Sequence, residues 1–398
     1  MGRLAFRLLP YALGYALSYL LRSANAVLAG PLAGDLGLSP AALGSLTASF
    51  YLAFALAQLP LGWLLDRYGP RRVLFPLLFV AGLGSLLFAL GLGFALLLIG
   101  RALMGAGVAL ALVGAVRAYQ LHIPAHMGAL SGFTVALGGL GGLLATSPMA
   151  YVTEGVGWQG AFLLLALLAF VLAFVGLCTV PRDPPSAKNR PGVVPGGVLR
   201  GFIPLSVDKE DSPGVASWGL VSLSLVAFAY IGGFFAVQSL WAGAYAYEVG
   251  LDARLVGLWL LILNAASVVG GVLAGILAGH CGTKCSLLLG IAFFTAGLFL
   301  WAMGVPLPLP YVILGLGGGF NGVLLAHCAS LFPGSAGQAM ALVNVIGVFG
   351  IFALQTVFGL AVEWVGYRVP LLGLVVLQSL ALSLVLWGDR MVRGWSGK

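Results

Sequence analysis

The sequence predicts an all-α polytopic membrane protein whose twelve transmembrane helices form two six-helix halves related by pseudo-twofold symmetry. Hydrophobic residues make up 61% of the 398 residues and charged residues only 8%, and the mean hydropathy is +1.08. A soluble domain carries about 25% charged residues, so this composition indicates a membrane protein. The other two observations are the length of the apolar runs and a repeat between the two halves of the chain.

The apolar runs predict twelve spans, because a helix needs about 20 apolar residues to cross the hydrocarbon core. The long polar interruption at residues 181–215 is rich in proline and charge, and we predict a cytoplasmic linker there. It separates an N-terminal six-helix bundle (1–180) from a C-terminal one (216–398). The predicted spans are residues 8–30, 41–65, 73–93, 95–118, 128–150, 159–180, 216–240, 253–279, 286–304, 308–331, 338–362 and 369–388.

The distribution of Lys and Arg predicts the orientation. The chain has 19 of these residues, and only Arg254 and Arg368 fall in loops that would be external. Arg22 and Arg101 lie inside spans, and the others lie in segments on the opposite side. Because positively charged loops stay in the cytoplasm, both termini are predicted to be cytoplasmic. We expect a multi-pass protein of the inner (plasma) membrane without a cleavable signal peptide, since the first apolar run is too long for one.

The two halves repeat without gaps inside each of two blocks, as expected for six-helix halves related by an axis along the membrane normal. A shift of 213 residues pairs Asp35 with Glu248, Gly37 with Gly250, Leu38 with Leu251, Gly44 with Gly257, Gly62 with Gly275, Gly69 with Gly282 and Arg71 with Lys284. A shift of 209 residues pairs Pro124 with Pro333, Gly128 with Gly337, Glu154 with Glu363 and Gly157 with Gly366.

A charged turn, GWLLDRYGPRR, interrupts the apolar sequence at residues 62–72. Its charges are costly in hydrocarbon, and Gly69 with Pro70 can end a helix and reverse the chain, while Gly62 would allow close helix approach. The stretch resembles the loop between the second and third helices of the major facilitator superfamily, roughly G-x-x-x-D-R-x-G-R-R/K. The resemblance implies a transporter fold and a conformational switch that includes Gly62, Asp66, Arg67, Gly69 and Arg71.

Two further expectations concern this switch. Asp66 should contact the inner end of the eleventh helix in the outward-open state, and its counterpart in the repeat is Gly279, so the charged loop is intact only in the first half. Arg101-x-x-x-Gly105-x-Gly107 resembles the fourth-helix arginine motif of the superfamily. That resemblance adds Arg101 to the switch as a charge that couples helix packing to proton movement. The alternative is an arginine satisfied by neighbouring carbonyls.

Arg22 is the charge that most needs a functional explanation. It lies 14 residues into the first predicted span, roughly 20 Å from its start, and all 11 acidic residues fall in loops or at span ends. A buried guanidinium needs charge compensation, and its planar fork matches carboxylate and phosphate. We therefore predict an anionic substrate at Arg22. The alternative is that backbone carbonyls and waters satisfy it.

A narrower resemblance supports this interpretation. The segment YLLRSAN at residues 19–25, followed by Pro31 and by GLS at 37–39, looks like the first helix of the organic-anion facilitators. These are the organophosphate:phosphate antiporters and the anion:cation symporters, in which this arginine binds substrate. Arg117, seven residues before Pro124, matches a fourth-helix arginine of the symporters; the alternative is an ordinary positive charge near the cytoplasmic end of its helix. Two positions depart from the pattern: Leu21 replaces the symporters' acidic residue, and Phe235 stands at the repeat counterpart of Arg22.

Polar and aromatic residues in other spans complete the candidate site. Tyr230, Phe234 and Gln238 share one helix face, although each polar residue could equally serve a helix–helix hydrogen bond. His327 is the candidate for proton coupling, since histidine titrates near neutral pH. The candidate substrate-binding residues are Arg22, Arg117, Tyr19, Tyr51, Tyr230, Phe234, Gln238, Asn264 and Asn344.

These features predict a secondary active or facilitative transporter of a small organic anion, a carboxylate or phosphate ester, that works by rocker-switch alternating access. Symport, uniport and exchange stay open. The alternative is an exporter of amphipathic compounds such as drugs or siderophores. The glycines at 138–142 lack the Gly-Pro-x-x-Gly-Gly signature of drug:proton antiporters, which counts against that alternative. A sensor without transport is disfavoured by the intact charged loop.

The sequence gives no support for enzyme chemistry, because no nucleophile–base pair, metal cluster or phosphate-binding loop stands out. We expect no cofactor and no metal. The expected partners are a small-molecule substrate, the lipid bilayer and a coupling ion, either a proton or sodium. No nucleic acid is expected, because the net charge of +8 is explained by the cytoplasmic loops, and the protein is predicted to be monomeric.

Overall fold

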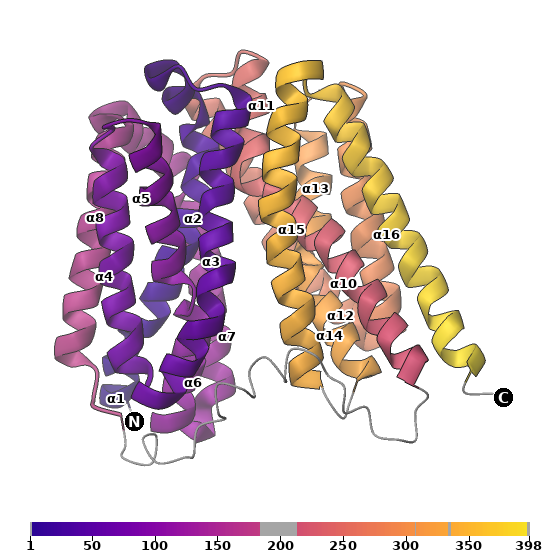
Figure 1. Ribbon diagram of the computed structural model, residues 1–398, viewed down its shortest axis with the longest axis horizontal. Coiled ribbons are helices and arrows are strands. Elements are labelled where there is room, and N and C mark those ends of the chain that lie inside the picture. Colours follow the sequence, from indigo (N-terminus) through magenta and orange to yellow (C-terminus); the bar gives the residue numbers. More distant parts are fainter. Residues whose placement is uncertain (1, 184–212, 307, 333–335, 396–398) are drawn as a thin grey trace. The chain divides into compact units, whose positions relative to one another are not determined.

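The computed structural model describes residues 2–183, 213–306, 308–332 and 336–395, and these residues form helices and turns without a strand (Figure 1). The predicted linker at 181–215 lies almost entirely outside the described residues. Two compact units are present. One consists of the described residues of Met1–Gly192 with Ser239–Leu261, and the other of the described residues of Val193–Gln238 with Ile262–Lys398. The division predicted at 180 and 216 stays a prediction.

The first unit contains the helices of the N-terminal half, drawn from indigo to magenta in Figure 1. The helix α8 (Ser147–Thr179) contains a turn at Gly157, which has a φ of 71°. This turn joins the end of the fifth predicted span to the sixth. The elements are α1 (Gly2–Arg7), α2 (Leu9–Leu36), α3 (Pro40–Tyr68), α4 (Pro70–Ala89), α5 (Phe94–Val108), α6 (Ala111–His122), η1 (Pro124–His126), α7 (Met127–Leu144), α8 (Ser147–Thr179) and α11 (Ala242–Glu248), with the start of α12 (Ala253–Ala302).

The second unit contains the remaining helices. Its boundary with the first falls inside η3 (Val237–Trp241), a π-helical turn in the seventh predicted span. Gly282 has a φ of 85° inside α12 and so divides the eighth span from the ninth. The other elements are α10 (Pro213–Ala236), α13 (Leu309–Gly319), α14 (Asn321–Leu331), α15 (Ala336–Val365) and α16 (Arg368–Trp395).

Ten helical segments among the described residues are long and apolar enough to cross a membrane. Two differences separate these ten segments from the twelve predicted spans. The first span is carried by α2, whose polar residues lower its hydropathy, and the eighth and ninth are joined as Ala253–Ala302 because the helix continues through Gly282. With these two taken into account, the ten segments correspond to the twelve spans that the sequence predicts.

The repeat seen in the sequence is also present in the backbone. Every described residue with a left-handed φ is a glycine, because a Cβ makes that conformation costly. Eight of the nine form pairs at the predicted shifts, so the two halves turn at equivalent places. The pairs are Gly37 and Gly250 (61° and 84°), Gly69 and Gly282 (83° and 85°), Gly91 and Gly304 (62° and 74°), and Gly157 and Gly366 (71° and 68°).

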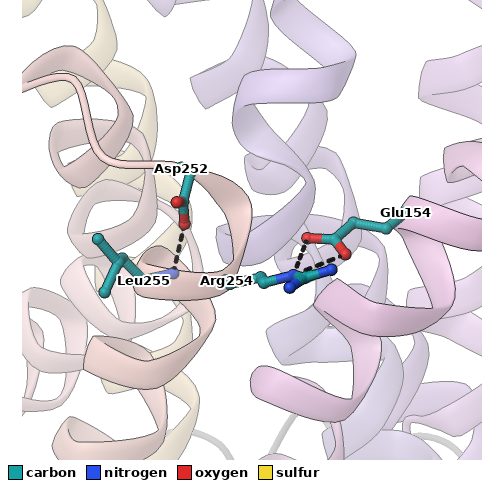
Figure 2. Close-up of polar contacts among 4 residues, drawn as sticks. All are labelled: Glu154, Asp252, Arg254 and Leu255. Atoms are coloured by element: carbon teal, nitrogen blue, oxygen red, sulfur yellow. Dashed lines mark hydrogen bonds and ion pairs between the residues drawn. The ribbon is translucent and has the colours of Figure 1, made fainter.

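Helix caps follow the same repeat. Ser39 accepts a hydrogen bond from the amide of Ala42 at 3.3 Å at the start of α3. Asp252, 213 residues later, accepts one from the amide of Leu255 at 2.8 Å at the start of α12, as Figure 2 shows. In both cases a side-chain oxygen satisfies an amide that the first helical turn leaves without a partner.

Small residues allow close helix packing in both units. A Cβ at Gly141 in α7 would meet the carbonyl oxygen of Ala16 in α2, and one at Gly350 in α15 would meet that of Phe228 in α10. Helix association in lipid depends on such contacts, since no hydrophobic effect drives it. Gly62 differs from our expectation, because no described residue of another helix lies within 4 Å of the place where its Cβ would be.

Candidate functional site

Three aromatic rings surround the guanidinium of Arg22. Arg22 lies midway along α2, and its Cζ is 4.8 Å from the ring centroid of Tyr19, 5.9 Å from that of Tyr51 and 5.2 Å from that of Phe54. A cation within about 6 Å of a ring centroid is attracted by the negative face of the ring. Arg22 is half-buried, whereas Tyr51 is 1% exposed and Phe54 is 9% exposed.

The helix pair α2 and α3 brings these residues together. Asn25 donates from Nδ2 to Oγ1 of Thr47 at 2.9 Å, which links the two helices near Arg22. Tyr51 and Phe54 are three residues apart in α3 and therefore share the face toward α2. The structure thus unites Arg22, Tyr19 and Tyr51 as predicted, and it adds Phe54, which sequence reasoning missed although its i, i+3 spacing from Tyr51 was a signal.

A second arginine lies directly behind this site. Arg101 in α5 is 0% exposed, and its Nη1 donates to the carbonyl oxygen of Leu21 at 3.2 Å. The same nitrogen lies 3.7 Å from Sδ of Met104, and Cζ lies 5.1 Å from the ring centroid of Phe50. Arg101 therefore contacts the α2 backbone at the residue that precedes Arg22.

Arg117 lies closer to a helix end. It is five residues before the end of α6 at His122, and its Nη1 donates to Oε1 of Gln120 at 2.7 Å. At 1.5 Å per residue, this is about 7.5 Å from that end. This contact within one helix does not distinguish the two roles weighed for Arg117, substrate binding and an ordinary charge near the cytoplasmic face.

The second unit brings Gln238 and Asn264 together. Nε2 of Gln238, in the π-helical turn η3, donates to Oδ1 of Asn264 in α12 at 2.7 Å, and both residues are buried. π-helical turns are rare in proteins, and those that occur often lie at functional sites. Two predicted site residues that are 26 positions apart in the chain thus form one polar pair.

The other predicted residues of this unit pack mainly within it. The hydroxyl of Tyr230 donates to the carbonyl oxygen of Gly317, and the Phe234 ring lies 5.8 Å from that of Phe294. Asn344 is half-buried in α15. His327 is buried in α14, and its Nδ1 lies 3.1 Å from Oγ1 of Thr283. The role of each in substrate binding or proton coupling stays a prediction.

The charged turn has the chain reversal that the sequence predicts, with Gly69 ending α3 and starting α4. Its partner Asp183 was not predicted: Oδ2 accepts the backbone amide of Arg71 at 3.2 Å, and Oδ1 lies 3.3 Å from Nε2 of His122. A carboxylate at the first turn of α4 is favourable because the helix dipole is positive there.

Two other members of the switch set differ in what the structure describes. The Arg67 guanidinium lies over the rings of Trp63 and Tyr68, at 5.0 and 5.4 Å. The Asp66 side chain lies outside the described residues, so its switch role stays a prediction.

An ion pair that the sequence did not reveal joins α8 to the start of α12. Nε of Arg254 donates to both carboxylate oxygens of Glu154, at 3.0 and 2.9 Å, as Figure 2 shows. The Arg254 guanidinium also lies 5.5 Å from the ring centroid of Tyr151. These residues are 100 positions apart in the chain, so no local pattern could have indicated the contact.

Comparison with known proteins places the chain in a family. The model of the Major Facilitator Superfamily matches residues 11–354. The chain belongs to the Major Facilitator Superfamily. This confirms the resemblance that the charged turn suggested, and it identifies the protein as a multi-pass membrane transporter that acts on a small-molecule substrate. Among the described residues, no group of three or more His, Cys, Asp or Glu residues could hold a metal ion.

Relatives with assigned names point in two directions. The chain is 25% identical to the probable sulfoacetate transporter SauU of Cupriavidus necator, over 94% of this chain and 93% of the relative. It is 26% identical to the probable galactarate/D-glucarate transporter GudP of Escherichia coli, over 65% of this chain and 62% of the relative. It is also 25% identical to the putative multidrug resistance protein MdtD of Salmonella paratyphi B, over 48% of this chain and 42% of the relative.

Solved structures of two other transporters have the same fold. The crystal structure of a D-xylose-proton symporter aligns with a TM-score of 0.75 at 20% identity and covers 98% of each chain. A bacterial homologue of the human lysosomal transporter Spinster aligns with a TM-score of 0.76 at 17% identity, over 98% of this chain and 97% of the other. This likeness confirms the predicted fold class of twelve helices in two six-helix halves.

Proposed function

We propose that this superfamily member transports a small organic anion, a carboxylate, sulfonate or phosphate ester, and that Arg22 binds the anionic group. The observation that carries the proposal is the position of Arg22: a guanidinium midway along α2, surrounded by the rings of Tyr19, Tyr51 and Phe54. Cation–π contacts leave the positive charge in place. An anion held by two parallel N–H···O bonds would match that charge and the planar geometry of the group.

The aromatic rings also indicate what the rest of the substrate contacts. The rings of Tyr19 and Phe54 beside the guanidinium would offer apolar surface to the part of the substrate next to its anionic group. The buried amide pair of Gln238 and Asn264 would hydrogen-bond polar groups of the substrate. Arg117, Tyr230, Phe234 and Asn344 remain in the proposed set from the sequence alone.

The named relatives support the anion without defining it. Sulfoacetate and the sugar diacids galactarate and glucarate are all small organic anions, and the relative matched over most of its length carries one of these names. The match to a putative multidrug resistance protein keeps an exporter of amphipathic compounds as the second candidate. Aromatic rings around Arg22 would suit such compounds too, so the experiment must separate charge recognition from apolar contact.

We further propose that transport occurs across the inner membrane by alternating access, with both termini cytoplasmic and with the chain acting as a monomer. We also propose that transport is coupled to a proton or a sodium ion. His327 is the proposed titratable group for a proton. His327 is buried beside Thr283, which removes the imidazole from bulk water and supports this choice.

The deciding experiment measures the thermal stability of the purified transporter with a panel of ligands. Sulfoacetate, D-glucarate, glycerol phosphate and the amphipathic cation tetraphenylphosphonium are added to wild type, Arg22→Lys and Arg22→Ala. A ligand of the native state stabilises by RT ln(1 + [L]/Kd), about 2.7 kcal/mol at 100 times Kd. Arg7→Ala serves as the control, because Arg7 is exposed at the end of α1 and its Nε donates to the carbonyl oxygen of Thr179.

We expect at least one anion to stabilise wild type and the control variant but neither Arg22 variant. Arg22→Lys should fail because a point charge cannot reproduce the bidentate fork. Stabilisation by tetraphenylphosphonium in all four proteins, with no response to any anion, would reject anion binding and favour the exporter.

The switch is tested at Asp66. If its charge biases the equilibrium between two conformations, Asp66→Asn should change the transport rate in proteoliposomes while the Kd of the anion changes much less. The neutral counterpart in the repeat supplies the control, since Gly279→Ala removes no charge. Unchanged rates in both directions across the membrane would contradict the proposed role of the loop.

A further inference from the structure

Arg101 is a buried charge that is not part of the proposed anion site. It is 0% exposed, and it makes no ion pair with any described residue. Nη1 is engaged by the Leu21 carbonyl and by Met104, whereas Nε and Nη2 have no hydrogen-bond partner among the described residues. A full positive charge held so deep in the protein is costly, and it therefore calls for a function.

The helix that carries Arg101 is fixed on two sides. A Cβ at Gly105 would meet the carbonyl oxygen of Phe50 in α3, and a Cβ at Gly100 would lie 2.8 Å from the carbonyl oxygen of Gly84 in α4. These close backbone contacts leave α5 little freedom to shift between α3 and α4. Arg101 is thus held on a rigid support, as the positioning of a binding group requires.

From this support Arg101 contacts both parts of the Arg22 site. Its hydrogen bond to the Leu21 carbonyl holds the α2 backbone one residue before Arg22. Its guanidinium lies over the ring of Phe50, which contacts the rings of Tyr51 at 5.3 Å and Phe54 at 6.3 Å. Both of those rings lie beside Arg22.

We propose that Arg101 is a positioning residue of the anion site, which orients Arg22 through the Leu21 carbonyl and the Phe50 ring and adds a second positive charge behind it. This inference rests on the proposed binding of an anion at Arg22. A second buried charge raises the attraction for an anion because the interior screens charges weakly. Its geometric role predicts that lysine cannot replace arginine, since lysine lacks the planar group that stacks on Phe50.

The first experiment measures the affinity for sulfoacetate and D-glucarate in wild type, Arg101→Lys and Arg101→Gln. The matched control is Arg7→Gln, which removes an arginine that also donates to a backbone carbonyl of another element, that of Thr179. We expect Arg101→Gln to raise Kd about tenfold or more, as loss of a charge in a weakly screened site should. Arg101→Lys should raise Kd less, and the control should bind as wild type does.

The second experiment needs no ligand and so stays informative if the proposed function is wrong. In a chain whose four cysteines are replaced by serine, Arg22→Cys introduces one thiol. Its rates of reaction with sulfonatoethyl and trimethylammonioethyl methanethiosulfonate are compared, with a neutral methanethiosulfonate as the measure of access. The positive charge of Arg101 should favour the anionic reagent, and adding Arg101→Gln should lower that preference about tenfold, whereas Arg101→Lys should retain it.

The outcomes separate the two proposals. If neither anion binds wild type but the reagent preference depends on Arg101, the choice of ligand is wrong and the electrostatic role of Arg101 stands. If anions bind through Arg22 but neither Arg101 variant alters Kd or reagent preference, Arg101 only packs α5 against α2 and the inference is wrong. A variant that merely loosens the fold would lower the melting temperature without changing the ratio of reagent rates. Should Arg101→Gln fail to fold, the Kd of Arg101→Lys decides.

Discussion

The two halves of this transporter share a backbone and differ in charge. Glycines with left-handed φ recur at Gly37 and Gly250 and at Gly69 and Gly282, 213 residues apart. At the same shift, Asp35 and Arg71 keep charged counterparts, whereas three charged residues of the proposed site and switch meet uncharged ones. Arg22 corresponds to Phe235, Asp66 to Gly279 and Arg101 to Leu314. The glycines at the turns were therefore retained in both halves, whereas these three charges stand in the first half alone.

Polar groups show how the equivalent positions diverged. Asn25 and Tyr51 in the first half correspond to Gln238 and Asn264 in the second, at the same shift of 213. In the first half these positions flank Arg22, with Asn25 bound to Thr47 and Tyr51 beside the guanidinium. In the second half the two amides bond each other. The comparison teaches that equivalent positions flank a cationic group in the first half and form a neutral amide pair in the second.

The largest expected effect tests the asymmetry of charge. Arg22→Gln should weaken anion binding about 10- to 150-fold, because hydrogen bonds to charged groups contribute about 1.5–3 kcal/mol. Phe235→Leu, at the repeat counterpart, should change the affinity little because it removes no charge. Isothermal titration with sulfoacetate measures both. Equal losses in the two variants would mean that Arg22 acts by packing, as Phe235 does.

Substitution of packing glycines tests the symmetry of the backbone. Gly141→Ala and Gly350→Ala should each destabilise by about 1–3 kcal/mol, since the added methyl group meets a backbone carbonyl of the neighbouring helix. Gly132→Ala and Gly373→Ala are the controls, because their added Cβ would have open space and alanine favours a helix. Apparent melting temperatures in detergent measure the effect. If Gly350→Ala left the melting temperature unchanged, the two halves would not pack alike.

A smaller effect is expected at the amide pair. Gln238→Ala should lower the anion affinity about fivefold, the equivalent of about 1 kcal/mol for one neutral hydrogen bond. Adding Asn264→Ala should lower the affinity little further, because the effects of two substitutions in one hydrogen-bonded pair are not additive. Gln378→Ala is the matched control, since Gln378 is also buried and donates to the Ala229 carbonyl at 2.7 Å without belonging to the proposed site. If the control lost affinity as well, the loss in Gln238→Ala would come from a disturbed fold and not from the binding site.

The smallest effect is expected at the ion pair of Glu154 and Arg254. The side chains are 33% and 65% exposed, so water and salt screen them. A double-mutant cycle with Glu154→Gln and Arg254→Gln should show coupling in the melting temperature at low salt and none at high salt. Glu363→Gln, which removes the equivalent carboxylate of the other half, serves as the comparison. Coupling that persists at high salt would indicate a pair shielded from solvent.

Local patterns in the sequence predicted most of the architecture. Hydropathy gave the spans because burial in lipid demands long apolar helices, and the glycines at the turns gave the repeat because only glycine adopts a left-handed φ at little cost. The charged turn predicted the superfamily. Arg22 could be identified as a candidate binding residue because a charge in mid-span is conspicuous within a single apolar run.

What the sequence by itself determined, then, is which segments cross the membrane, how the halves repeat and which charges lie within spans. Only the tertiary structure decided which side chains meet: Phe54 with Arg22, Arg101 with the Leu21 carbonyl, and Glu154 with Arg254. It also decided that residues 239–261 belong with the first unit, from a break inside the π-helical turn η3. The reason is physical: hydropathy and turn chemistry act within one segment, whereas these contacts depend on the rotation and tilt of helices, which packing against neighbours sets.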